Sequence, residues 1–178
     1  MAVRLPVSPR ALVVAAAIPL LFLHVAYQPG VSVGPIDAYL SDFAVLAVVV
    51  TAIVVGARDR FAALRAGRPL WIALACFLVW MVVEVALGRH HAPSYATRTH
   101  AITAAKFAEY ALLAPSVAIL LRRVVDLLLA AWTLVVWSCF ATIVGVAQFF
   151  GANIFLAGTV GRRQASFLAS ADFAALSA

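Results

Sequence analysis

The sequence predicts an all-α fold, a polytopic transmembrane helical bundle with five full spans and the start of a sixth. Hydrophobic residues make up 66% of the 178 residues, and charged residues only 11%. A soluble domain has about 45–50% apolar and about 25% charged residues. This chain therefore has too few polar side chains to cover a globule in water, and the bilayer must act as solvent for most of its surface.

The predicted spans are apolar runs of roughly the 20 residues that cross a bilayer. Pro19 and Pro115 lie inside two of them, where neighbouring helices can satisfy the carbonyls that a proline frees. The runs cover residues 11–27, 38–57, 70–87, 101–121 and 126–150, and a sixth begins at 172 and continues to 178. We treat 1–178 as a single transmembrane helical domain. We expect it to be the front portion of a longer protein, because the sixth run stops about two turns after it begins.

The connections carry residues that end or begin helices. Gln28, Pro29 and Gly30 close the first run, and Asp37 or Ser41 is suited to capping the second. The segment 151–171 is the longest connection. Its run 153–156 is rich in apolar residues, which favours a position along the membrane interface.

The arginines indicate a cytoplasmic N-terminus, because the short cytoplasmic loops of membrane proteins are rich in Lys and Arg. With that orientation the inner face carries Arg4, Arg10, Arg58, Arg60, Arg65, Arg68, Arg122 and Arg123. The outer face carries only Arg89, Arg98, Arg162 and Arg163. The formal charge of +6 comes mainly from these loops. Because no basic stripe with interleaved aromatic residues is present, nucleic acid is not an expected partner.

Three ionisable residues fall within the apolar runs, where charge is costly and often functional. Lys106 and Glu109 are three residues apart on one helix face. That spacing favours a structural ion pair over a proton relay. Glu84 has no local partner in the sequence, and Lys106 or Arg98 could pair with it across helices. Cys76 and Cys139 lie in apolar runs and are expected to be buried structural thiols.

The polar connection 88–100 contains His90, His91 and His100. Adjacent histidines point in different directions, and no acidic residue accompanies them. A zinc site needs better spacing and a further ligand, so we expect no metal here. A solvated loop that adds positive charge near an anionic substrate remains an alternative to a plain loop.

Arg162 and Arg163 are the leading candidates for substrate binding. In the orientation argued above they face outward, against the general trend. The planar guanidinium fork matches phosphate oxygens bidentately, so the pair could hold the pyrophosphate of a lipid-linked donor. The alternative is that both side chains extend to lipid headgroups. The chain has no phosphate-binding glycine loop, no nucleophile elbow, no zinc-protease motif and no dinucleotide fingerprint. The residues by themselves therefore identify no reaction.

The region behind the fifth run resembles the O-antigen ligase and O-antigen polymerase family. The resemblance is carried by Gln148-Phe149-Phe150-Gly151, then Gly161-Arg162-Arg163, then Ser166-Phe167, then Asp172-Phe173-Ala174-Ala175-Leu176. Lys106-Phe107-Ala108-Glu109-Tyr110 in the fourth run also looks like that family's arrangement. Asp172 stands where the family usually has asparagine, although aspartate keeps a helix-capping side chain.

The resemblance implies a multi-pass protein of the bacterial inner membrane that takes part in lipopolysaccharide biosynthesis in the cell envelope. Such glycosyltransferases move glycan from an undecaprenyl pyrophosphate donor, on the periplasmic side, to lipid A core, to another glycan or to protein. They use no nucleotide sugar and no metal or other cofactor. Arg162 or Arg163 would match the family's arginine in this loop. The family's catalytic histidine lies in a later external loop, so no catalytic residue is assigned, and residues 1–178 alone are expected to be inactive.

Two other classes stay open. In a membrane transporter or flippase subunit, Lys106, Glu109 and Glu84 would line an ion or substrate path. A non-catalytic membrane protein is the third possibility.

Overall fold

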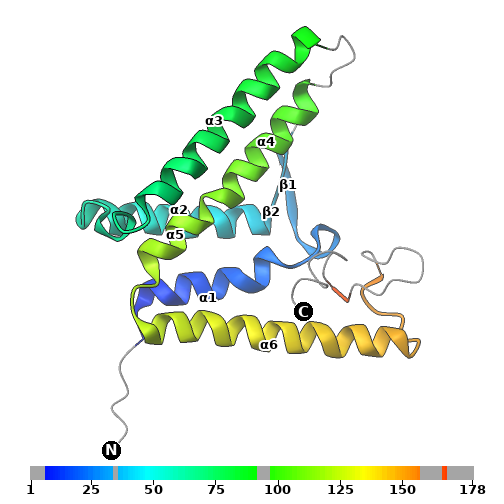
Figure 1. Ribbon diagram of the computed structural model, residues 1–178. Coiled ribbons are helices and arrows are strands. Elements are labelled where there is room, and N and C mark those ends of the chain that lie inside the picture. The colour runs from blue at the N-terminus through cyan, green and yellow to red at the C-terminus, as the bar shows by residue number, and fades with distance from the viewer. Residues whose placement is uncertain (1–6, 34–35, 92–96, 157–165, 168–178) are drawn as a thin grey trace, which may run out of the picture. The chain divides into compact units, whose positions relative to one another are not determined.

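A computed structural model describes residues 7–33, 36–91, 97–156 and 166–167, and the described part of the chain is mainly helical (Figure 1). In chain order the elements are α1 (Pro9–Leu21), the 3-10 turn η1 (Val25–Tyr27), β1 (Gly30–Val33), β2 (Ile36–Tyr39), α2 (Leu40–Arg58), η2 (Ala62–Leu64), α3 (Arg68–His91), α4 (Thr97–Ala111), α5 (Leu113–Leu120) and α6 (Val124–Phe149). They form two compact units, residues 1–48 with 121–178 and residues 49–120, and α2 runs through the boundary.

Four helical segments are long and apolar enough to cross a membrane: Leu40–Arg58, Arg68–Gly88, Thr97–Leu120 and Val124–Phe149. They correspond to the second, third, fourth and fifth predicted runs, so the prediction of a helical membrane protein is confirmed at this level. Large apolar side chains cover their surfaces, and the apolar part of α3 has no buried residue. The predicted start of a sixth span at 172–178 lies outside the described residues.

The first predicted run, 11–27, forms a shorter helix than expected. The helix ends at Leu21, and a 3-10 turn follows. The side-chain amide of Gln28 explains the stop, because it donates to the carbonyls of Leu20 and Leu23 at the end of α1. The same side chain accepts a hydrogen bond from the backbone N–H of Ser41 in the first turn of α2, at 2.8 Å. One buried glutamine thus completes the ends of two helices, whose terminal groups have no partner within the helix.

A short antiparallel β-hairpin precedes α2, which the sequence analysis did not predict. Val31 pairs with Ala38 and Ser32 with Asp37, and the Ser32 hydroxyl donates to the Asp37 carboxylate at 2.7 Å. The prediction that Asp37 or Ser41 caps the helix after residue 38 is therefore wrong. Asp42 accepts from the backbone N–H of Tyr39 at 2.9 Å, and this is the reciprocal half of a capping box.

In the first unit, α1 lies alongside α6 and both helices run in the same direction (Figure 1). Their first turns are joined by Asp126, which is 2% exposed and accepts from the backbone N–H of Ser8 at 3.1 Å. Ser8 is itself the N-cap of α1. A carboxylate at this position is favourable, because it lies at the positive ends of two helix dipoles.

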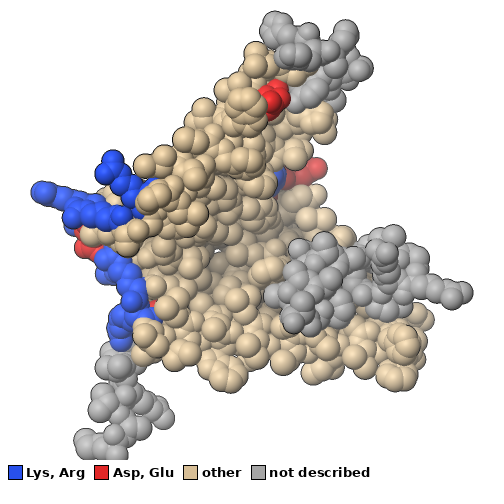
Figure 2. Space-filling model, in the orientation of Figure 1, with Lys and Arg blue, Asp and Glu red and all other residues tan. Residues whose placement is uncertain are grey.

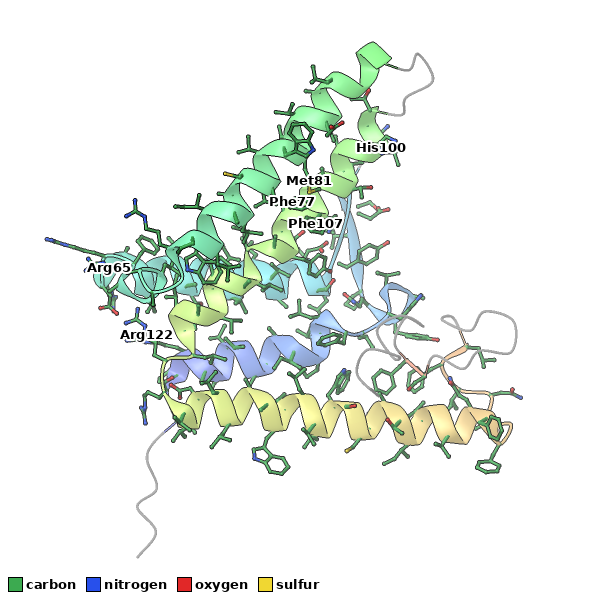
Figure 3. All side chains as sticks on the ribbon, viewed as in Figure 1. Arg65, Phe77, Met81, His100, Phe107 and Arg122 are labelled. Carbon is green, nitrogen blue, oxygen red and sulfur yellow. The ribbon has the colours of Figure 1, made fainter. Side chains whose placement is uncertain are left out.

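The second unit contains the hairpin of α3 and α4 (Figure 1). Phe77 and Phe107 meet across it with ring centroids 5.7 Å apart, as the labelled side chains in Figure 3 illustrate. The predicted fourth run is interrupted at Leu112, because Pro115 cannot donate a backbone hydrogen bond three residues later. The Leu112 carbonyl accepts from the backbone N–H of Ser116 at 3.2 Å and from the Ser116 hydroxyl at 2.7 Å, so the helical ladder resumes directly after the proline.

The two cysteines differ from the prediction. Cys76 and Cys139 are free thiols on exposed helix surfaces rather than buried ones. Apolar runs on membrane helices have no obligatory inner face, so position within such a run does not indicate burial inside the protein.

Candidate functional site

The side chain of Gln148 organises the chain behind α6. Gln148 is 4% exposed, and its amide nitrogen donates to the carbonyls of Ile154, Phe155 and Ser166 at 2.6, 3.1 and 3.4 Å. Its amide oxygen accepts from the backbone N–H of Ser166 at 2.8 Å. The described residues on both sides of 157–165 are therefore held at one point near the end of α6.

Phe167 fills an aromatic cluster beside this amide. It is 2% exposed, and its ring lies 4.8 Å from that of Trp137, 5.4 Å from that of Phe140 and 5.7 Å from that of Phe155, measured between centroids. Its carbonyl accepts from the backbone N–H of His24 at 3.0 Å. Such ring pairs contribute about 0.5–1.5 kcal/mol each beyond the area that they bury. Ser166-Phe167 is thus held in the first unit by the aromatic rings around Phe167 and by the backbone of His24.

Two buried polar atoms beside this cluster have no hydrogen-bond partner among the described residues. They are the indole Nε1 of Trp137 and the hydroxyl of Ser166. Ser166 is fully buried and has a φ of 57°, a left-handed conformation that non-glycine residues rarely adopt. Both groups can donate a hydrogen bond to an oxygen atom. Strained, unpaired polar residues are concentrated at functional sites.

The leading candidates from the sequence lie outside the described residues. Arg162, Arg163 and Asp172 fall in 157–165 and 168–178, so their predicted roles stay predictions. What the structure adds is the fixed position of the residues on both sides of the arginine-bearing segment, Phe155 before it and Ser166 after it.

Lys106 and Glu109 form the predicted ion pair. The ammonium nitrogen of Lys106 lies 3.6 Å from a carboxylate oxygen of Glu109, and the two side chains are 33% and 27% exposed. Glu84 lies exposed on α3. The ion pair described in this hairpin therefore joins Lys106 to Glu109, and Glu84 is not part of it. Such a pair neutralises itself locally, which suits a structural role.

The polar connection between α3 and α4 is shorter than the predicted loop 88–100. The helix α3 continues to His91, and α4 begins at Thr97. His100 is therefore in the first turn of α4, where it is exposed (Figure 3). Within the described ranges, no group of three His, Cys, Asp or Glu residues could hold a metal ion.

Sequence reasoning placed Gln28 at the end of the first run and Gln148 in the family resemblance, but it did not predict the hydrogen bonds that either side chain makes. Both are polar side chains in or next to long apolar runs. Burying an amide costs several kcal/mol unless it is hydrogen-bonded, so an isolated glutamine in such a run is a signal of a tether. The partners of Gln148, up to 18 residues away, could not be read from that signal.

No known protein family, no curated protein and no solved structure matches this chain.

Proposed function

We propose that the chain forms the N-terminal part of an inner-membrane glycan transferase of the O-antigen ligase or polymerase type. The protein moves glycan from an undecaprenyl pyrophosphate donor on the periplasmic side to an acceptor such as lipid A core or another glycan. The N-terminus is cytoplasmic, and Arg162 and Arg163 bind the pyrophosphate.

The arrangement around Gln148 is the observation that supports this proposal most directly. Gln148 and Ser166-Phe167 are among the residues that carry the family resemblance, and they contact one another in a buried cluster. They fix the residues on both sides of the segment that contains the arginines. A binding segment needs such anchoring, because a site that must be ordered by its ligand loses part of the binding energy.

The parallel packing of α1 and α6 supports one part of the proposed topology, that the N-terminus and the 122–123 connection lie on the same side of the membrane. The hydrogen bond from the Ser8 N–H to Asp126 holds the first turns of both helices together. The two helices therefore begin on the same side. In the five-span topology the N-terminus and the 122–123 connection are both cytoplasmic, which agrees with this packing.

The chemistry assigned to the arginines follows from the leaving group. When the acceptor hydroxyl attacks the anomeric carbon, it gives up its proton, the bond to the pyrophosphate oxygen breaks and negative charge develops on that oxygen. Guanidinium groups in a site shielded from water stabilise such charge more strongly than water does. No metal is needed for that step.

The test is to change the arginines in the complete gene and measure glycan attachment in cells. Arg162→Ala with Arg163→Ala should abolish attachment while the protein remains at its normal level in the membrane. Arg162→Lys with Arg163→Lys should restore part of the activity, because charge is kept and the bidentate fork is lost. Glu109→Gln is the matched control and should retain activity. Normal attachment without both arginines would refute the proposal, and loss of activity in Glu109→Gln alone would favour the transporter or flippase class.

A further inference from the structure

The turn between α2 and α3 has a defined backbone in the second unit. The N–H of Phe61 donates to the Gly56 carbonyl at 2.7 Å and that of Arg60 to the Ala57 carbonyl at 3.3 Å, which is the Schellman pattern of a helix end. Arg60 and Phe61 both have a positive φ, 49° and 52°. The Phe61 ring covers Gly56, where an added Cβ would lie 2.6 Å from ring carbons. The turn therefore has a defined conformation, held by backbone hydrogen bonds and by the packing of the Phe61 ring.

A shallow, open groove of about 310 Å³ lies where this turn enters α3. Its walls are mainly apolar, and two guanidinium-bearing residues stand among them. The lining residues are Phe61, Leu64, Arg65, Arg68, Trp71, Ile72 and Ala75. Arg65 is labelled at this turn in Figure 3.

The groove combines positive charge with an aromatic wall formed by Trp71. Between Arg58 and Arg68 the chain has four arginines and one aspartate, and in Figure 2 blue side chains gather over this turn at the left of the view. The indole of Trp71 lies over Gly67, where an added Cβ would be 2.8 Å from Nε1. That Nε1 is buried and has no acceptor among the described residues.

We propose that this groove binds an anionic phospholipid, with the phosphate at Arg65 and Arg68 and the lipid's apolar part against Trp71 and Ile72. The site is independent of the glycan-transfer proposal. Arginine recognises phosphate through paired N–H donors, and tryptophan side chains are enriched at the headgroup level of a bilayer.

The surroundings favour a lipid over a free phosphate or an acidic peptide. The groove stands at the junction of two membrane-length helices, α2 and α3. From Trp71 its apolar wall continues to Ile72 and Ala75 on α3, whose apolar part has no buried residue. An acyl chain attached to a headgroup at the arginines therefore has an apolar surface to lie on. A soluble anion has no apolar part that could be buried against that surface.

Native mass spectrometry of the complete protein in detergent, with added phosphatidylglycerol or phosphatidylcholine of the same acyl chains, tests the proposal. We expect phosphatidylglycerol to bind roughly tenfold or more tightly, since each juxtamembrane arginine adds about a fivefold preference for anionic lipid. Arg65→Gln with Arg68→Gln should remove the preference. The matched control, Arg122→Gln with Arg123→Gln, should keep it. Equal loss in both double variants, or displacement of the lipid by soluble glycerol phosphate, would overturn the proposal.

A second measurement does not depend on the arginine variants folding. Brominated phosphatidylglycerol should quench tryptophan fluorescence more than brominated phosphatidylcholine does. This difference should disappear in Trp71→Phe and persist in Trp132→Phe, whose tryptophan lies exposed on α6. An unchanged difference in Trp71→Phe would show that the anionic lipid binds elsewhere and would contradict the proposal.

Discussion

The two compact units hold themselves together in different ways. In the first unit, buried polar side chains join residues far apart in the sequence: Asp126 contacts Ser8, Gln28 contacts Ser41 and Gln148 contacts Ser166. In the second unit, the α3–α4 hairpin relies on neighbouring helices, a ring contact and a half-exposed ion pair. Each buried amide or carboxylate forms hydrogen bonds with backbone groups. In a membrane protein these groups need such partners, because the bilayer core contains no water to bond them. The first unit is therefore held together by hydrogen bonds of buried polar side chains, whereas the second unit exposes an apolar helix surface.

The largest effect is expected from removing the polar tether of the first unit. Gln148→Leu keeps the side-chain volume but leaves three carbonyls and one N–H without their partner. The free energy of unfolding should fall by on the order of 3 kcal/mol, because unsatisfied buried groups cost more than their hydrogen bonds contribute. Thermal unfolding in detergent micelles measures this. Val146→Leu, on the exposed side of the same turn, is the control and should change little. A similar loss in both variants would contradict the tethering role.

Emptying the aromatic cluster should have a comparable effect. Phe167→Ala removes a ring that is 2% exposed and leaves a cavity beside Trp137. Buried Phe→Ala changes cost about 3 kcal/mol at the lower end. The emission of Trp137 should shift as its surroundings change, and the melting temperature should drop. Phe150→Ala, at a ring that is 82% exposed, provides the comparison. If the two variants melt together, Phe167 is not part of a packed core.

The smallest effect is expected in the second unit. Breaking the pair of Lys106 and Glu109 by Glu109→Gln should lower the free energy of unfolding by only about 0.5 kcal/mol, because half-exposed pairs on one helix are weak. A double-mutant cycle with Lys106→Met isolates the coupling. A coupling above about 2 kcal/mol would mean that the pair is desolvated and that the comparison between the units fails.

The sequence predicted the parts of the fold that depend on composition and length. The run 126–150 became the helix Val124–Phe149, and the i,i+3 spacing of Lys106 and Glu109 correctly predicted an ion pair. The misses have other causes. The early end of α1 and the docking of Ser166-Phe167 depend on hydrogen bonds that the Gln28 and Gln148 side chains make with residues elsewhere in the chain. The hairpin before α2 is a short local pairing between Gly30 and Tyr39. Hydropathy marks both glutamines as polar residues and says nothing about their partners.

The proposed function requires that residues 157–165, which contain Arg162 and Arg163, face the periplasm. Thr159→Cys in a background with Cys76→Ala and Cys139→Ala gives one reactive site there, and Ala62→Cys in the α2–α3 turn gives the matched site for the opposite face. In intact cells a membrane-impermeant maleimide should label Thr159→Cys at once and Ala62→Cys only after the inner membrane is opened. The reverse pattern would put the arginines in the cytoplasm and exclude them from binding a periplasmic diphosphate donor.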